Sequence, residues 1–170
     1  MKNPFRLIEL LWLGGAKPRV RWHLRALIHA RMRGNTLLGR YVEGRLARKH
    51  GLFISHKATF PVSLDLKHPT GVVIGEGVVI GENVKIFQNV TLGGARSGDW
   101  RSKSYPVIGD DTTIFAGAVV IGRITVGRNC IIGANAVVTR DVPDNATAVG
   151  IPARIIQKDS TESSSEHTNP

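Results

Sequence analysis

The stretch GVVIGEGVVIGENVKIFQNVTLGG, residues 71–94, places an aliphatic residue at every sixth position from Ile74 to Leu92. The same step of six continues on both sides of this stretch and is broken twice. It lengthens to eight between Leu66 and Ile74 and to sixteen between Leu92 and Ile108. The thirteen slots of the series are Ile54, Phe60, Leu66, Ile74, Ile80, Ile86, Leu92, Ile108, Ile114, Val120, Val126, Ile132 and Val138.

A period of six residues indicates a β-helix, in which each short strand forms one face of a coil. A second set of mostly small or β-branched residues lies two positions before the slots, and residues two apart on a strand point to the same face. Both sets are therefore predicted to point inward, in a left-handed parallel β-helix of a little over four coils. The second set is Val72, Val78, Val84, Val90, Thr112, Ala118, Ile124, Cys130 and Ala136. A sandwich is disfavoured because its turn signals recur every roughly 8–12 residues.

The net charge of +10 is concentrated in the N-terminal segment. Residues 1–50 hold twelve Lys or Arg and two acidic residues, whereas the rest of the chain holds eleven of each sign. We therefore divide the chain into a basic helical segment (1–50), an all-β domain (51–156) and a polar tail (157–170) predicted to be disordered. Helically spaced apolar residues predict α-helices in the first segment, with a break near Gly14–Gly15 and Pro18.

Two interpretations of the basic segment stay open. It caps the first coil or forms a subunit contact, or it offers a basic amphipathic surface to an anionic membrane or an acidic partner. Nucleic acid is not expected as a partner, because aromatic residues are few and no binding motif is present.

The apolar runs and the single cysteine indicate the cellular compartment of the protein. Glu9 interrupts a short apolar run, so neither a secretion signal nor a membrane span is expected. The single cysteine, Cys130, fits a reducing compartment and occupies an inward slot, where it is expected to be a core residue rather than a nucleophile. We therefore predict a cytoplasmic protein.

The two breaks in the rhythm are the candidate sites of chemistry, because a perfectly repeating coil offers no projecting groups. The first break contains His68, and histidine is the commonest general base near neutral pH; a structural turn histidine is the alternative. The second is the loop Gly94–Tyr105, which carries Trp100 and Arg101. Loops on a rigid scaffold often carry function, although a tolerated insertion would look the same. The breaks are expected on neighbouring corners of the coil or facing each other across a subunit boundary.

Five short stretches resemble the catalytic domain of bacterial serine acetyltransferases, a branch of the hexapeptide-repeat acyltransferases. They are HPTGVVIGE (68–76), VTLGG (90–94), AGA (116–118), DVP (141–143) and GIPAR (150–154). The resemblance runs from Gly51 to Ile156, about 106 of 170 residues. It implies a homotrimer that transfers the acetyl group of acetyl-CoA to a hydroxyl, without a metal.

The resemblance also assigns roles by position. His68 is the catalytic base, which takes the proton of the acceptor hydroxyl as that oxygen attacks the thioester. Backbone N–H groups at glycine corners are expected to stabilise the oxyanion, and two arginines to meet the CoA phosphates. The residues assigned to acetyl-CoA are Gly93, Gly94, Ala116, Gly117, Ala134, Arg140 and Arg154. Those assigned to the acceptor are Glu76, Trp100, Arg101 and Tyr105. Whether Asp65, Glu76 or neither orients the histidine is left open.

The chain departs from the resemblance on the acceptor side. Lys67 stands where the family has an aspartate beside the histidine, and Phe53 where it has a second aspartate. Ser104-Tyr105 replaces an Arg-His pair whose arginine binds the serine carboxylate. The family's tail that docks on a cysteine-synthesis enzyme is also replaced, so that complex is not expected. Because a serine hydroxyl cannot replace a bidentate arginine, we predict that the acceptor is not serine. The chain is similar to short relatives that acetylate sugar hydroxyls, and this resemblance implies a sugar acceptor in capsule or exopolysaccharide synthesis. A lipid-linked glycan at the inner membrane face is a further hypothesis.

Three other functions remain as alternatives. The first is a serine O-acetyltransferase of cysteine biosynthesis. The second is a zinc hydratase on the same coil, which needs about three histidine ligands; the sequence offers His56 and His68, with His50 just before the coil. The third is a non-catalytic hexapeptide-repeat scaffold.

Overall fold

The structure, a computed structural model, describes residues 16–96 and 98–157 of the 170-residue chain. Two helices come first, α2 (Ala16–Met32) and α3 (Thr36–His50). Pro18 lies in the first turn of α2, where its missing N–H costs no helical hydrogen bond. The helices part at Gly34, which has a φ of 62° and which the sequence analysis missed. Gly14–Gly15, Glu9 and the tail after position 157 lie outside the described residues.

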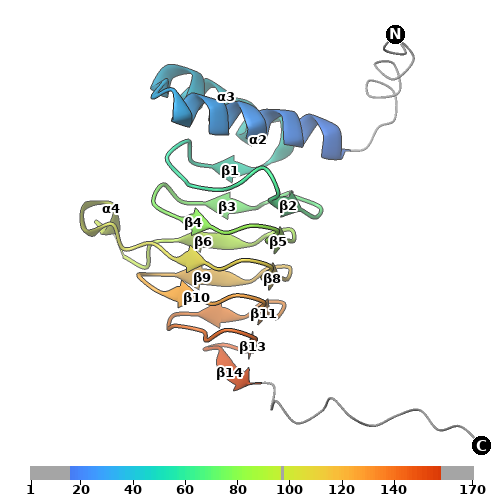
Figure 1. The fold of residues 1–170 in the computed structure, drawn as a ribbon, viewed down its shortest axis with the longest axis vertical. Helices are drawn as coiled ribbons and strands as arrows, with labels where there is room; N and C mark the ends of the chain where they lie inside the picture. Colours follow the sequence, from blue (N-terminus) through green and yellow to red (C-terminus); the bar gives the residue numbers. More distant parts are fainter. Residues whose placement is uncertain (1–15, 97, 158–170) are drawn as a thin grey trace, which may run out of the picture.

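Three sheets of short strands form the three faces of a coil below the helices (Figure 1). Face A consists of β1 (Phe53–Ile54), β3 (Val73–Ile74), β6 (Thr91–Gly93), β9 (Val119–Ile121) and β12 (Val137–Val138). Face B consists of β4 (Val79–Ile80), β7 (Val107–Ile108) and β10 (Thr125–Val126). Face C consists of β2 (Asp65–Leu66), β5 (Lys85–Ile86), β8 (Thr113–Ile114), β11 (Ile131–Ile132), β13 (Ala146–Val149) and β14 (Arg154–Gln157).

The chain visits the faces in the order A, B, C, so each coil has three corners, here called AB, BC and CA. Strands that follow one another on a face pair in parallel, as Thr91 does with Val119. Among the strands of the described residues, only β14 runs antiparallel. The predicted left-handed parallel β-helix with a helical N-terminal segment is confirmed.

The six-residue rhythm is the core of the coil. All thirteen slots and all nine residues two positions before them are buried. Burying a Val or Ile side chain stabilises a fold by about 1.5–3 kcal/mol, so this column is the main source of stability. The polar member is Thr112, which is fully buried. Its hydroxyl donates to the carbonyl of Gly127 at 2.9 Å and accepts from the amide of Cys130 at 3.1 Å.

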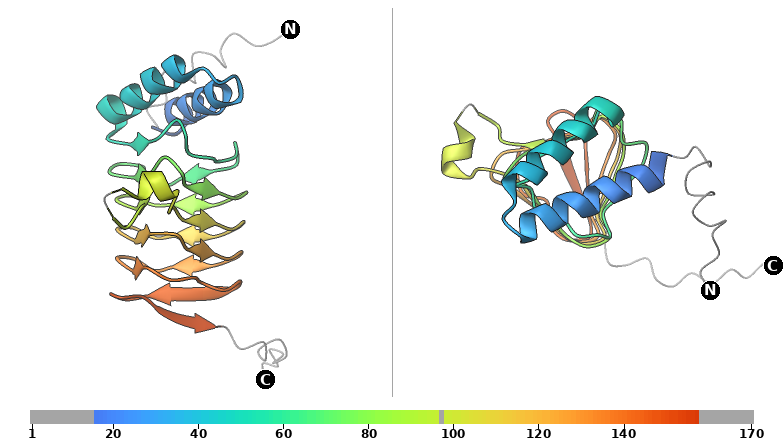
Figure 2. Two further views of the ribbon diagram at one scale, coloured as in Figure 1. Left: turned by 90° about the vertical axis from the view of Figure 1, so that its left-hand side faces the viewer. Right: turned by 90° about the horizontal axis from the view of Figure 1, so that it is seen from above.

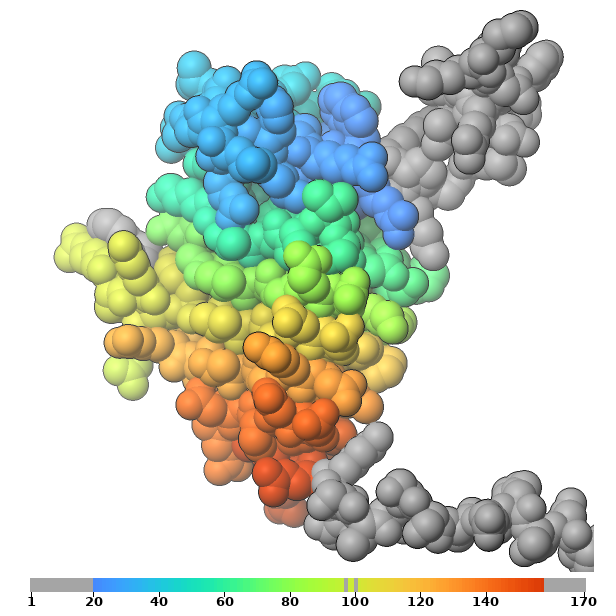
Figure 3. All heavy atoms as spheres, in the orientation of Figure 1, coloured from blue at the N-terminus to red at the C-terminus, as the bar shows by residue number. Residues whose placement is uncertain are grey.

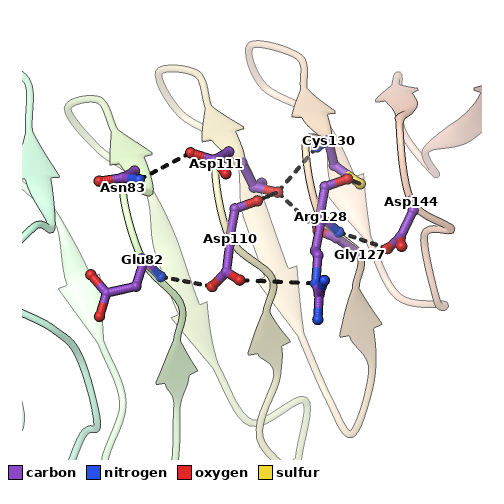
Figure 4. A network of polar contacts seen from close by, with 9 residues as sticks. Glu82, Asn83, Asp110, Asp111, Gly127, Arg128, Cys130 and Asp144 are labelled. Atoms are coloured by element: carbon purple, nitrogen blue, oxygen red, sulfur yellow. Dashed lines mark hydrogen bonds and ion pairs between the residues drawn. The ribbon is translucent and has the colours of Figure 1, made fainter.

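Corner BC is held by a polar ladder from coil to coil (Figure 4). Its left-handed residues are Asn83, Asp111, Asn129 and Asn145. Asn and Asp adopt this conformation at lower cost than other side-chain-bearing residues. The Asn83 amide donates to the Asp111 carboxylate at 3.1 Å, and the Glu82 backbone N–H donates to Asp110 at 2.8 Å. This corner is occupied by structural contacts, and no predicted site residue lies on it.

The two ends of the coil are covered differently. Helices α2 and α3 lie across the first coil, and a short loop helix, α4 (Asp99–Ser102), projects sideways (Figure 2). Leu24, Leu27 and Leu46 belong to the same core as the coil. At the far end β14 pairs with β13. No helix in the described part of the chain is long and apolar enough to cross a membrane.

Candidate active site

His68 projects from corner CA of the first coil. The connection from β2 to β3 has six residues, Lys67–Val72, against four from β5 to β6. The longer connection places His68 in the left-handed region, with a φ of 53°, and leaves the residue exposed. A non-glycine residue with positive φ is uncommon, and such strain often accompanies functional sites.

The charges beside His68 are paired with one another. Asp65 contacts Lys67 at 2.5 Å and Arg21 of α2 at 4.0 Å. Glu76 lies on corner AB, where it accepts from Lys57 at 2.8 Å. Neither carboxylate bonds to His68, and no other side chain within residues 16–96 and 98–157 does. The histidine is therefore presented to solvent without an acidic partner from the described part of its own chain.

Three of the residues assigned to acetyl-CoA lie on the same corner as His68, in the coils that follow. Ala116, Gly117 and Ala134 all lie on corner CA, in later coils. The amide of Gly117 donates to the carbonyl of Gln88 at 3.0 Å, and the amide of Asn135 donates to that of Ala116 at 2.9 Å. Ala116 and Gly117 are half-buried and Ala134 is exposed, and the assignment of these residues to acetyl-CoA stays a prediction.

Gln88 is a polar residue of this column that the sequence analysis missed. It stands where the later coils have Ala116 and Ala134. Its Oε1 atom is buried and has no hydrogen-bond partner among the described residues. A buried, unsatisfied acceptor costs free energy, so it is a candidate contact for a bound substrate. Aligning the corners coil by coil would have revealed Gln88, which follows Thr70 and precedes Ala116 and Ala134 in this column.

The loop after β6 forms the second group, on corner AB. Within this loop the carboxylate of Asp99 accepts hydrogen bonds from the backbone amides of Ala95 at 2.6 Å and Arg96 at 2.7 Å. The Tyr105 ring lies over Gly77, where an added Cβ would come within 2.1 Å of it. Burial, followed by the negative charge of Glu76, raises the pKa of Tyr105 above its usual value.

The structure divides the predicted acceptor and acetyl-CoA residues between the two corners. Glu76, Arg101 and Tyr105 lie at corner AB with Gly93 and Gly94, and face A separates them from His68 of the same chain. The Trp100 side chain lies outside the described part.

The two predicted phosphate ligands lie at the end of the coil. Arg140 follows β12 and donates to the carbonyl of Ala153 at 3.1 Å. Arg154 opens β14 and pairs with Val149, the last residue of β13. Within one chain, then, His68 shares its corner with Ala116, Gly117 and Ala134 but not with the predicted acceptor residues.

Other polar clusters do not form a second chemical centre. His56 bonds to Glu43 at 2.9 Å, joining the first coil to α3. Within the described ranges no group of three or more His, Cys, Asp or Glu residues is placed to hold a metal ion. A cavity of about 310 Å³ in the helical segment is lined by Trp22, His23, Lys49 and His50, none of which was assigned to the site.

Comparison with known proteins identifies the family of the chain. Residues 105–140 match the model of the bacterial transferase hexapeptide (six repeats). The chain is 49% identical over 106 residues to the serine acetyltransferase of Bacillus pumilus, covering 62% of this chain and 48% of that protein. It is 40% identical over 121 residues to that of Buchnera aphidicola, covering 71% and 46%. The resemblance to the serine acetyltransferase branch of the hexapeptide-repeat acyltransferases is confirmed.

Solved structures agree with this assignment. A serine acetyltransferase in complex with CoA superposes with a TM-score of 0.71 at 34% identity, over 79% of this chain and 54% of that one. The Neisseria gonorrhoeae serine acetyltransferase in complex with serine gives 0.70 at 37% identity, over 78% and 54%. The chain spans about half the length of the relatives it matches.

The prediction of a sugar acceptor in polysaccharide synthesis is contradicted, because these relatives and solved structures are named serine acetyltransferases. The prediction rested partly on Ser104 and Tyr105 at the end of the loop. The structure places that loop on corner AB, across face A from His68. Two changed residues at the end of one loop do not outweigh 49% identity over 106 residues to a serine acetyltransferase.

Proposed function

We propose that the protein is a serine O-acetyltransferase that uses acetyl-CoA as donor and His68 as general base. The observation that carries the proposal is the exposed, left-handed His68 at the lengthened corner. The 49% identity to a serine acetyltransferase over 106 residues supports the substrate. The region proposed to carry this activity is the coil domain, residues 51–156.

In the proposed reaction, one proton moves from the serine hydroxyl to His68 and then to the leaving CoA thiolate. The imidazole of His68 takes the proton from the serine hydroxyl while the hydroxyl oxygen forms a bond to the thioester carbonyl carbon. The carbon–sulfur bond then breaks, and the CoA thiolate leaves and takes the proton back from the imidazolium. The products are O-acetylserine and CoA.

The glycine backbone predicted to bind the oxyanion and the described residues predicted to bind the acceptor lie on corner AB, not beside His68 of the same chain. We propose a homotrimer in which corner AB of one subunit faces corner CA of the next. This arrangement would bring the Gly93–Gly94 backbone, Arg101 and Tyr105 of one subunit toward His68 of its neighbour. Because acetyl-CoA is a cytoplasmic metabolite, the proposed reaction takes place in the cytoplasm.

The deciding assay is CoA release from acetyl-CoA with L-serine, followed with a chromogenic disulfide. We expect turnover by the parent chain and a loss of about 10²–10⁴-fold in kcat for His68→Ala. His29→Ala is the matched control, because His29 is an exposed histidine on α2 away from the corner, and it should keep the parental rate. An unchanged rate in His68→Ala, or no CoA release with serine, would overturn the proposal.

The trimer is tested separately by light scattering of the purified full chain. The expected mass is three times the 18.5 kDa of one chain. A monomer with full serine turnover would reject the shared site but not the reaction.

A further inference from the structure

The helical segment presents an outward surface that the proposed reaction does not use. Helices α2 and α3 bury one side against the coil and turn the other away from it (Figures 2 and 3). The exposed residues of this outer side recur every three or four positions along both helices, as one side of a helix requires. We call them the cap face: Trp22, Arg25, His29, Met32, Arg33, Leu37, Arg40, Tyr41 and Arg48.

The cap face is positively charged and contains no acidic residue. From Val20 to His50 the sequence has eight Lys or Arg and one acidic residue, Glu43. Glu43 is turned toward the coil, where it bonds to His56 at 2.9 Å. The coil domain, residues 51–156, has ten basic and eight acidic residues, so it is nearly balanced. The positive charge is therefore gathered at one end of the molecule.

Large apolar side chains lie between these cations. Leu37 is 80% exposed, Met32 79%, Trp22 66% and Tyr41 59%. The Arg45 guanidinium lies 5.9 Å from the centre of the Tyr41 ring. Single exposed apolar residues are common, but four on one basic surface are not explained by packing among residues 16–96 and 98–157. Aromatic and aliphatic side chains enter the boundary between headgroups and acyl chains, while arginines reach the phosphates.

We propose that the cap face docks on an anionic lipid surface, with α2 and α3 lying flat on it. Charge complementarity selects this partner, because the face offers arginines without competing carboxylates. The exposed apolar residues favour a bilayer over a nucleic acid, whose phosphates would leave them in water. The proposal is independent of the proposed enzyme activity, so either can fail without the other.

The test uses the purified full chain with vesicles of phosphatidylcholine alone, or of phosphatidylcholine with phosphatidylglycerol, in a sedimentation assay. We expect binding to the vesicles that contain phosphatidylglycerol and little to the neutral ones. Binding should weaken strongly between 0.1 and 1 M salt, because the screening length falls from about 10 Å to about 3 Å. Equal binding to both vesicle types would overturn the proposal.

Matched variants locate the contact. Arg25→Gln, Arg40→Gln and Arg48→Gln together remove three charges from the cap face. Each cation near an anionic surface contributes about fivefold to binding, so the triple variant should bind about 100-fold more weakly. The control triple variant changes the net charge equally on the coil and should keep most of the binding: Lys85→Gln, Arg123→Gln and Arg128→Gln. Equal losses in both variants would show a net-charge effect and overturn the proposal.

Two further readouts separate lipid from other partners. Leu37→Ser should lower the vesicle affinity by a similar factor at low and at high salt, because it removes an apolar contact that salt does not screen. No effect of this change at either salt would argue against insertion of the face. Tighter binding to a DNA duplex than to the anionic vesicles at the same salt would overturn the lipid assignment in favour of nucleic acid.

Discussion

Replacing Thr112 by valine tests whether the core of the coil depends on one buried hydroxyl. Valine has nearly the same shape as threonine, and it stands at the equivalent inward position in other coils, for example Val84. Apolar patterning alone therefore predicts that Thr112→Val stabilises the protein. The hydrogen bonds of the hydroxyl predict the opposite.

The magnitude follows from the two backbone groups that the hydroxyl satisfies, the Gly127 carbonyl and the Cys130 amide. Leaving a buried polar group without a partner costs about 1–3 kcal/mol. The valine methyl returns about 1 kcal/mol of apolar burial. With both groups left unsatisfied, we therefore expect Thr112→Val to lower the free energy of unfolding by about 1–5 kcal/mol. Thr112→Ser keeps the hydroxyl and removes one methyl, so it should cost only about 1 kcal/mol.

Urea denaturation of the parent and the two variants, at one protein concentration, measures these differences from the transition midpoints. The expected order of stability is parent, then Thr112→Ser, then Thr112→Val. A Thr112→Val protein as stable as the parent would refute the reasoning, because it would show that the two backbone groups do not need the hydroxyl.

Two further predictions concern corner CA and the core thiol. Gly117 has a φ of 73°, and an added Cβ would lie 2.1 Å from Oδ1 of Asn135. Gly117→Ala should therefore lower the stability by about 1–2 kcal/mol from the backbone conformation alone. In a double-mutant cycle of thermal unfolding, Asn135→Gly should recover the part of the loss that is due to the steric clash. Burial raises the pKa of Cys130 above its usual value, so the folded chain holds the thiol proton more tightly than the unfolded chain. This contribution to stability is present below the pKa of the unfolded thiol, about 8.5, and is lost as pH rises through the folded value. Cys130→Ala should therefore show a shallower fall in urea midpoint between pH 7.5 and 9.5, and equal slopes would contradict the assignment.

The scaffold could be predicted from the sequence because each inward slot depends only on its own six-residue unit. Counting slots by threes from Ile54 also assigns the breaks to corners. Leu66 is a third slot, so the first break falls between faces C and A. Leu92 is a first slot, so the second falls between faces A and B. The corners of both breaks are therefore contained in the spacing of the sequence.

Contacts between coils could not be predicted in the same way. The packing of Tyr105 over Gly77 and the pair between Lys57 and Glu76 join residues that are 28 and 19 positions apart. They depend on side-chain directions at corners that carry no repeating pattern. The position of the loop relative to His68 is likewise a property of the folded coil, so the two changed loop residues could not by themselves identify the acceptor.

The antiparallel strand β14 affects whether copies of the protein associate end to end. A stack of parallel coils ends in a strand whose free N–H and C=O groups could pair with another copy, as in amyloid. Here β14 pairs back on β13 from Ala146 to Val149 in the reverse direction, and α3 packs over β1 at the opposite end. A variant that lost β14 would expose a ready template, so its first failure would be fibre growth by end-to-end addition.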